Sequence, residues 1–370
     1  MNTVKTWRRK IVAVLLCILS IILIGLLVVF INSPGKLSPL KDARGNVIPG
    51  SISEKVWVEI GGIKQGMFIR GENPENPVLL YLHGGPGTPM LQFIEYLEED
   101  ARLEESFTVC YWDQRGSGMT YDKSTDVATM TLEQMVEDTH EVTQYLQSRF
   151  GQDKIYLLGH SWGSYLGVKA IEKYPENYLA YIGIGQVTNQ TESEQLAYEY
   201  MLGHAKEIND RDVIEKLEQY DPYANDFPQL DYLTKGRTNI LNRYGIGHLH
   251  QGITNADIVK SLFVFKGYTI SEKINWFRGA DFSMIHLFPV VLGDDLFVTS
   301  AEFDVPFYIV QGAYDYQVSQ VLAEKYLEAI TAPKKEFFIL SDSAHSPNME
   351  EPEAVIEIFR KIASENPPKQ

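Results

Sequence analysis

The sequence predicts an α/β fold in which helices cover both faces of a mostly parallel central sheet. Short apolar runs alternate with helix-length segments, as residues 78–82 (VLLYL) and 131–150 illustrate. A continuous apolar run of this kind is typical of a strand buried on both faces. A glycine-rich turn, residues 159–163 (GHSWG), also stands between a predicted strand and a predicted helix. Because ligands of such sheets bind at the carboxyl ends of the strands, functional residues are expected in the loops that follow strands.

The core elements are expected in the following order. Residues 54–60 and 63–70 alternate in polarity around a Gly-Gly pair and predict a β-hairpin. Thr131 and Gln134 occupy capping-box positions at the start of the 131–150 helix. The other core strands are expected at residues 78–82, 107–112, 154–158, 181–185, 305–310 and 336–340, and the other core helices at residues 90–103, 164–174, 318–330 and 351–363.

Between residues 188 and 299 the pattern changes. Helical stretches such as residues 191–208 and 211–220 dominate, and no run has the character of a buried strand. We therefore predict a helical cap, residues 188–299, inserted after the sixth core strand and lying over the site. The core then comprises residues 54–187 and 300–370.

The GHSWG turn is predicted to be a nucleophile elbow, the signature of the α/β-hydrolase fold. Ser161 stands at its tip, between the strand over residues 154–158 and the helix over residues 164–174. So sharp a turn strains the serine backbone and requires small neighbours, which Gly159 and Gly163 provide. Since the turn lifts the hydroxyl off the sheet, Ser161 is the candidate nucleophile.

A serine nucleophile needs a base, and the base needs an acid that orients it. In this fold the chain order is Ser, then Asp or Glu, then His. His345 is the only histidine after Asp315 and follows the last predicted strand, so it is the candidate base. Asp315 follows the preceding strand and is the candidate acid. Asp304 and Asp342 are the alternatives, but Asp304 precedes its strand and Asp342 is only three residues from His345.

Two backbone N–H groups are expected to form an oxyanion hole. One belongs to Trp162, the residue after Ser161. The other is placed at Gly85, within residues 83–87 (HGGPG), directly after a predicted central strand. Gly84 and Gly85 suit this position because the backbone must approach the substrate closely.

The N-terminus carries an uninterrupted hydrophobic run that starts at Ile11 and ends at Ile31. A helix of this length spans the ~30 Å hydrocarbon core of a bilayer. Basic residues 8–10 precede it, so the positive-inside rule keeps the N-terminus in the cytoplasm and sends the remainder across the cell membrane. A cleaved signal peptide is the alternative, but its apolar region would be only ~7–15 residues with a small-x-small cleavage site. We expect a single-pass signal anchor over residues 1–31 and a tether over residues 32–53.

Composition narrows the classes of partner. The net charge of −16 argues against a nucleic-acid partner. Cys17 and Cys110, the two cysteines, cannot form a disulfide framework. The spacing of the histidines does not indicate a metal site, so no metal and no cofactor are expected.

Taken together, the motifs resemble the proline iminopeptidases (prolyl aminopeptidases) of the α/β-hydrolase superfamily. The likeness rests on residues 83–87 (HGGPG), 113–118 (DQRGSG) and 159–164 (GHSWGS), followed by the late acid and histidine. It covers roughly residues 54–365 and is dense in motifs only outside the predicted cap.

This resemblance implies a catalytic triad of Ser161, Asp315 and His345. It also implies cleavage of an N-terminal residue, often proline, from short peptides without a metal. Members of the family bind the substrate's α-amino group with glutamates of the cap, one of them in a Trp-Glu pair, and this chain has no such pair. The glutamates that remain open for this role are Glu192, Glu194, Glu199 and Glu272.

The predicted function is that of a membrane-anchored serine hydrolase that forms an acyl-enzyme, as an aminopeptidase acting on short peptides. Because an ester substrate needs no amine anchor, the missing Trp-Glu pair favours an alternative, a carboxylic-ester hydrolase on the same scaffold. A non-catalytic, membrane-bound binding protein is a third alternative, against which the complete triad argues.

Overall fold

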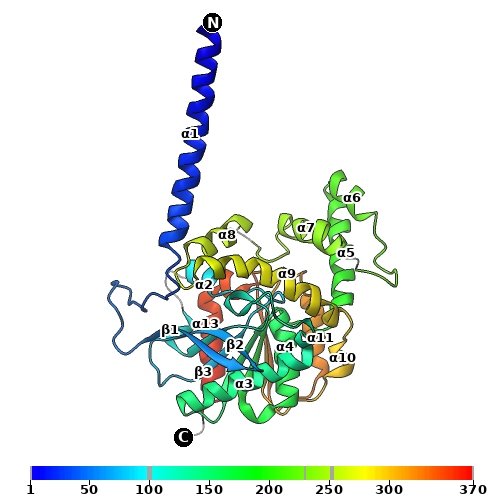
Figure 1. Cartoon of the computed structure of the whole chain (residues 1–370). Helices are drawn as coiled ribbons and strands as arrows, with labels where there is room; N and C mark the ends of the chain where they lie inside the picture. The colour runs from blue at the N-terminus through cyan, green and yellow to red at the C-terminus, as the bar shows by residue number, and fades with distance from the viewer. Residues whose placement is uncertain (1, 98–101, 229–230, 251–253, 369–370) are drawn as a thin grey trace.

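A single eight-stranded sheet forms the centre of the computed structural model, which describes residues 2–97, 102–228, 231–250 and 254–368 (Figure 1). The strand order is β1-β2-β4-β3-β5-β6-β7-β8. The β1–β2 and β2–β4 pairs are antiparallel, and the five pairings from β4 to β8 are parallel, so the sheet is mostly parallel as predicted. The strands are β1 (Ile52–Ile60), β2 (Ile63–Gly71), β3 (Val78–Leu82), β4 (Thr108–Asp113), β5 (Ile155–His160), β6 (Tyr178–Ile184), β7 (Phe307–Gly312) and β8 (Lys335–Leu340).

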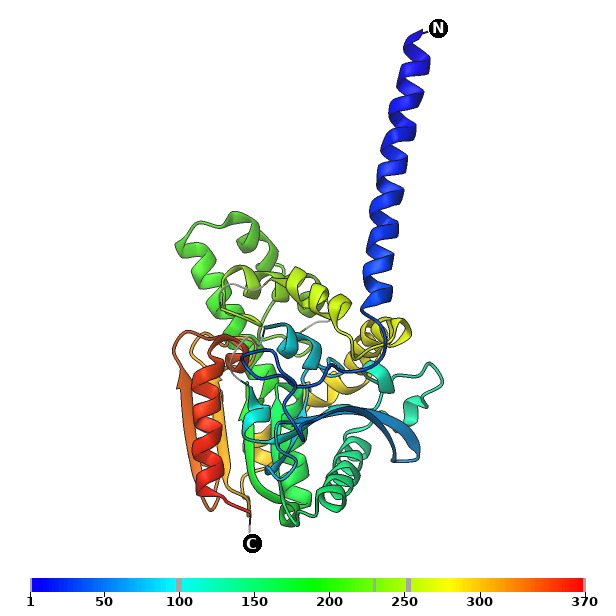
Figure 2. The same ribbon diagram turned by 90° about the vertical axis from the view of Figure 1, so that its left-hand side faces the viewer.

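Helices cover both faces of this sheet (Figures 1 and 2). One face packs on α3 (Leu132–Phe150), α4 (Trp162–Lys173) and α11 (Gln320–Ala329), and the other packs on α2 (Leu91–Leu97) and α13 (Pro352–Glu365). In β3, Leu80 and Leu82 belong to the first hydrophobic cluster, whereas Tyr81 belongs to the second. Side chains of a strand alternate between faces, so an all-apolar strand supplies both cores.

Capping explains why the α3 helix could be predicted. The Thr131 hydroxyl accepts a hydrogen bond from the Gln134 N–H at 3.2 Å, and Gly151 ends the helix with a left-handed φ of 64°. The prediction for the helix from residue 90 to residue 103 was less accurate. α2 ends at Leu97, and residues 98–101 lie outside the described residues.

A helical insertion, α5 to α10, stands between β6 and β7 and lies above the sheet (Figures 1 and 2). Its first helices have an apolar cluster of their own, which includes Met201, Leu217 and Leu241. The insertion therefore packs as a unit of its own as well as on the sheet. Its elements are α5 (Gln190–Glu207), α6 (Arg211–Leu217), η5 (Tyr232–Arg237), α7 (Thr238–Arg243), α8 (Asn255–Val264), α9 (Ile270–Leu292) and α10 (Leu296–Thr299).

One N-terminal helix, α1 (Asn2–Ile31), projects away from the body (Figure 1). Its Lys10–Ile31 portion is long and apolar enough to cross a membrane, a property shared by signal sequences and membrane anchors. The segment that follows α1 lies on the body, where Leu37 and Leu40 are buried. The Lys36 N–H also donates to the Lys266 carbonyl at 3.0 Å.

A buried ion pair joins the loop after β4 to α3. Arg115 Nε and Asp138 Oδ2 lie 2.7 Å apart, and both side chains are almost fully buried. Arg115 also donates to the Gly61 carbonyl, and Asp138 accepts from the amides of Gln65 and Gln134. These hydrogen bonds satisfy the two charges and connect the β1–β2 turn, the β4 loop and α3.

We expect Arg115→Met to lower the free energy of unfolding by about 3–5 kcal/mol, because it leaves the Asp138 carboxylate buried without its cation. Arg149→Met is the control. Arg149 pairs with Glu54 at a partly exposed site, and such pairs contribute about 0–1 kcal/mol. Denaturant unfolding of the full chain in detergent measures both variants, and equal losses would contradict the assigned role of Arg115.

Candidate active site

Ser161 lies at the predicted turn between β5 and α4. Its φ of 56° is rare for a residue with a Cβ and carries strain on the order of 1–3 kcal/mol. Neighbouring hydrogen bonds hold this conformation. The Ser161 N–H donates to the Ile184 carbonyl at 2.9 Å, and the Ser161 carbonyl accepts from the Ser164 hydroxyl at 2.6 Å.

The two glycines of the turn are required by close backbone packing. A Cβ on Gly159 would lie 2.3 Å from the Gly163 carbonyl oxygen, and a Cβ on Gly163 would lie 2.0 Å from the Leu82 carbonyl oxygen. The start of α4 therefore touches the backbones of β3 and β5. Any larger residue at either position would push the helix, and Ser161 with it, away from the sheet.

Asp315 and His345 form a buried hydrogen-bonded pair beside this turn. His345 Nδ1 and Asp315 Oδ2 are 2.9 Å apart, and both side chains are almost fully buried. Asp315 also accepts from the Gln317 and Val318 N–H groups and from the Gln311 amide, at 2.7–3.0 Å. Four donors thus surround the carboxylate and fix its position beside His345.

The alternative acids lie elsewhere. Asp304 and Asp342 are both exposed, and the Asp342 N–H binds the Glu351 side chain. His345 Nε2 has no hydrogen-bond partner among the residues that the structure describes. With Nδ1 donating to Asp315, Nε2 carries the lone pair and is free to act on a substrate or a hydroxyl.

Two residues with backbone donors that are unpaired among the described residues lie in the site, Trp162 and Gly85. Neither the Trp162 N–H nor the Gly85 N–H has an acceptor within the described parts of the chain. Gly84 lies against the serine, since a Cβ placed on it would be 3.0 Å from Ser161 Cβ. Gly85 has a φ of 111°, which a residue with a side chain rarely adopts.

The Gln114 side chain connects the loop after β3 to the start of α4, a contact that the sequence analysis did not predict. The Gln114 amide donates to the His83 carbonyl at 3.2 Å and accepts from Trp162 Nε1 at 3.0 Å. His83 Nδ1 bonds the Gly84 carbonyl at 2.9 Å. The 113–118 motif therefore holds the HGGPG loop against the start of α4. A glutamine carries no reactive group, so nothing in the sequence singles out this role.

Three further histidines lie near the pair, the buried His83 and His160 and the half-buried His248, and desolvation favours the neutral form of each. Burial lowers the pKa of His83 to about 4 and that of His248 to about 3. Burial, and secondarily the neighbouring His345, hold the pKa of His160 well below its usual value. His160 Nε2 bonds the His345 carbonyl at 3.0 Å, so its direct contact is with the loop that carries His345.

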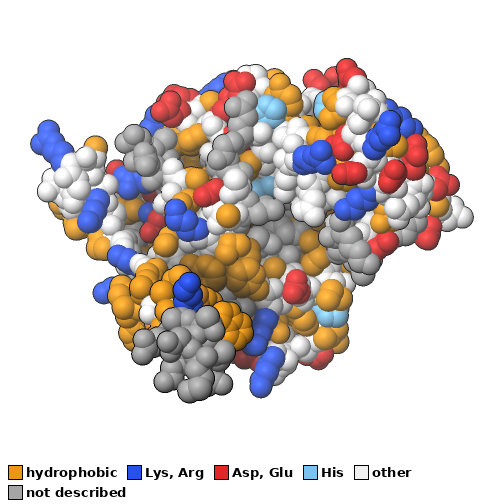
Figure 3. Space-filling view, turned by 90° about the horizontal axis from the view of Figure 1, so that it is seen from above, with side chains coloured by type: hydrophobic (Ala, Val, Ile, Leu, Met, Phe, Trp, Pro, Cys, Tyr) orange, Lys and Arg blue, Asp and Glu red, His pale blue; other side chains and the backbone are white. Residues whose placement is uncertain are grey.

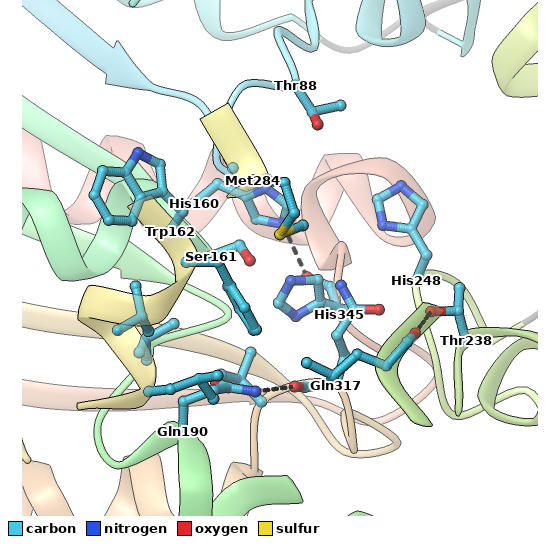
Figure 4. Close-up of a pocket in the computed structure, with 18 of the residues that line it drawn as sticks. Thr88, His160, Ser161, Trp162, Gln190, Thr238, His248, Met284, Gln317 and His345 are labelled. Carbon is cyan, nitrogen blue, oxygen red and sulfur yellow. Dashed lines mark hydrogen bonds between the residues drawn. The ribbon is translucent and has the colours of Figure 1, made fainter. Parts of the chain in front are cut away.

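The serine and the histidine open into one cavity of about 580 Å³ between the sheet and the helical insertion (Figure 4). Trp162 and Gly85 lie in the same wall, so the cavity brings together four of the five predicted site residues, with Asp315 directly behind His345. Most of the lining is apolar. The insertion contributes Leu233, Met284, Ile285, Phe288, Pro289, Val291 and Leu292, together with the polar residues Gln190, Arg237 and Thr238.

No Asp or Glu lines this cavity within the described parts of the chain. The four glutamates left open by the sequence lie elsewhere. Glu192 and Glu199 are exposed, and Glu272 pairs with Lys55 at 2.6 Å. Glu194 comes nearest, behind the cavity wall. It is fully buried and pairs with Arg237 at 2.6 Å, so its charge is neutralised by a cation that does line the cavity.

Comparison with known proteins agrees with this fold. The model of the alpha/beta hydrolase fold matches residues 77–352, which is most of the chain. The chain belongs to the α/β-hydrolase family. Within this family the hydrolase is 32% identical to the probable aminopeptidase YbaC of Bacillus subtilis (strain 168), over 82% of this chain and 93% of that protein.

Other relatives of this α/β hydrolase are proline iminopeptidases. That of Chitinophaga pinensis is 36% identical over 33% of this chain and 39% of its own length. The crystal structure of a proline iminopeptidase from Mycobacterium smegmatis covers 85% of this chain and 98% of its own, with a TM-score of 0.62 at 17% identity. At that identity the structural likeness supports the fold alone.

We expect Gly185→Ala to separate His345 from Asp315. Gly185 has a φ of 55°, and a Cβ there would lie 2.7 Å from His345 Cε1. The hydrogen-bonded Nδ1 proton of His345, which we expect far downfield in the proton NMR spectrum of the unaltered protein, should be lost or shifted. Gly203→Ala is the control, because its Cβ meets nothing within 4 Å. An unchanged His345 resonance in the Gly185 variant would contradict this placement.

Proposed function

We propose that the protein is a serine hydrolase in which Ser161 is the nucleophile, His345 the base and Asp315 the acid that orients His345. The observation that carries the proposal is the buried 2.9 Å His345–Asp315 pair beside a strained serine, in the wall of one cavity. The Trp162 and Gly85 N–H groups are proposed as the oxyanion hole.

The proposed reaction has two halves. His345 Nε2 takes the hydroxyl proton as Ser161 Oγ bonds to the substrate carbonyl carbon, and the oxygen of that carbonyl becomes an oxyanion held by the two N–H groups. The bond to the leaving amine or alcohol then breaks, and His345 returns the proton to that group. Water next adds to the acyl-enzyme and gives its proton to His345. Ser161 leaves and recovers that proton, and the free acid departs.

For the substrate we propose short peptides, from which the enzyme releases the N-terminal residue. The support is the 32% identity with a probable aminopeptidase over 93% of that protein. The cavity favours a second candidate, carboxylic esters. Its described lining holds no carboxylate for a substrate amine, and Arg237 neutralises the nearest one, Glu194.

The domain organisation and membrane placement are part of the proposal. Residues 188–299 would act as the cap over a core of residues 54–187 and 300–370. Residues 1–31 would anchor the chain in the cell membrane with the N-terminus in the cytoplasm, and residues 32–53 would connect the anchor to the core. The length and apolar composition of α1 support the anchor.

We expect Ser161→Ala to reduce turnover by about 10⁴-fold or more, because it removes the nucleophile and leaves only the oxyanion hole and binding. The assay is a panel of Pro-, Ala- and Leu-arylamides beside short acyl esters, with a fluorophosphonate probe to label the serine. Ser364→Ala, at an exposed site, is the control.

The outcomes of this panel separate the candidates. Arylamide turnover that is lost in Ser161→Ala supports the aminopeptidase. Turnover of esters alone, at high enzyme concentration, identifies the ester hydrolase. Absence of both turnover and labelling would contradict the serine-hydrolase mechanism itself.

A further inference from the structure

Exposed apolar side chains gather on the outer surface of helices α8 and α9. They are Val259, Phe263 and Val264 of α8 and Ile270, Ile274, Phe277, Met284 and Ile285 of α9. On α9 their spacing of three, four and seven residues places them along one side of the helix. Single exposed apolar residues are common, but a group of eight on two consecutive helices marks a contact surface. We call this set the apolar strip.

The apolar strip lies where α1 ends. Lys273 of α9 donates to the Asn32 carbonyl, one residue beyond α1, at 2.8 Å. Pro34 forms a β-bridge with Thr269, directly before Ile270. Figure 3 looks down α1 and shows orange side chains beside its base. The C-terminal end of the bilayer-length helix is therefore held at the level of the strip by direct hydrogen bonds.

Charge around the strip differs from that of the whole molecule. The ionic side chains beside it include the basic Lys36, Lys260, Lys266 and Arg278, against the acidic Asp257 and Asp281, in a chain of net charge −16. Large apolar groups with Lys and Arg at their margin are typical of helices that lie in a bilayer interface, where the bases meet anionic headgroups.

The far end of the strip reaches the cavity. Met284 and Ile285 are exposed, and both also line the cavity that contains Ser161. Phe288 and Pro289, one turn further along α9, continue this lining. Apart from the exposed Asp281 between Phe277 and Met284, apolar side chains thus lead along α9 from the base of α1 to the candidate active site.

We propose that the apolar strip contacts the lipid bilayer that holds α1, and that the cavity accepts amphiphilic substrates whose apolar part enters from the lipid surface. The proposal rests on the proposed anchor and hydrolase function. The bilayer is the occupant that explains the three observations together: the position of the α1 end, the basic margin and the path to the cavity.

The test uses the full chain in lipid nanodiscs whose acyl chains carry a shallow quencher. An environment-sensitive fluorophore is attached to one cysteine at a time. Native Cys17, exposed in α1, reports the anchor, while Cys110 is buried. In a Cys17→Ser background, Phe263→Cys and Phe277→Cys report the strip. Val298→Cys, on α10 and 79% exposed, is the matched control away from α1 (Figure 1).

We expect quenching at Cys17 and at both strip positions but not at position 298. Quenching at Cys17 alone would overturn the contact surface and leave the anchor intact. Absence of quenching at Cys17 would overturn the anchor and the surface with it. Cross-linking between copies at position 263, without lipid quenching, would assign the strip to a second copy of this chain. None of these results depends on turnover. The membrane contact can therefore be tested even if the proposed hydrolase mechanism is wrong.

The substrate part is tested with Phe263→Asp/Phe277→Asp in nanodiscs. We expect kcat/KM for a dodecanoyl ester or dodecyl-bearing peptide to fall about tenfold, because two charges weaken the interfacial contact. Turnover of a water-soluble acetyl ester should stay unchanged, as in the Val298→Asp control. An equal fall for both substrates, or for neither, would overturn the lipid-surface route.

Discussion

The close contact between the start of α4 and the backbones of β3 and β5 is the constraint on which the candidate site depends. Gly163 has no room for a Cβ against the Leu82 carbonyl, and Gly159 has none against Gly163. This contact forces Ser161 into a positive φ and turns its side chain away from the sheet. The loop after β3 is fixed by the same contact, so the serine and the HGGPG loop cannot move independently.

The histidines around the serine differ in their hydrogen-bond partners, and this difference decides which of them can carry a charge. Of these four histidines, His345 alone has a carboxylate partner among the described residues, the Asp315 side chain, whereas His83 and His160 bond backbone carbonyls and His248 faces the Ser346 hydroxyl. Burial therefore leaves those three neutral. Three of these rings, His160, His248 and His345, line the cavity, and the carboxylate that could stabilise an imidazolium lies beside His345.

The helical insertion gives the cavity its chemical character. Its contribution is mostly apolar, and the cation in its wall, Arg237, is neutralised by Glu194 behind it. The insertion also carries the apolar strip, whose helices are bonded to the end of α1. Helix α9 thus both lines the cavity and is bonded to the residue that follows α1.

Local patterns in the sequence determined the sheet, its flanking helices and the elbow, because strand periodicity, the α3 caps and steric need for glycine act over a few residues. The order of residues along the chain predicted Asp315 as the acid and His345 as the base, since the loops after parallel strands meet at one edge of the sheet. Only the tertiary structure decided the contacts between residues that are far apart in the sequence. They are the Arg115–Asp138 pair, the Gln114 bridge, the Glu194–Arg237 pair and the position of α1 beside α8 and α9. Residues of the insertion pack irregularly, and their partners are set by three-dimensional contacts that no short-range pattern records.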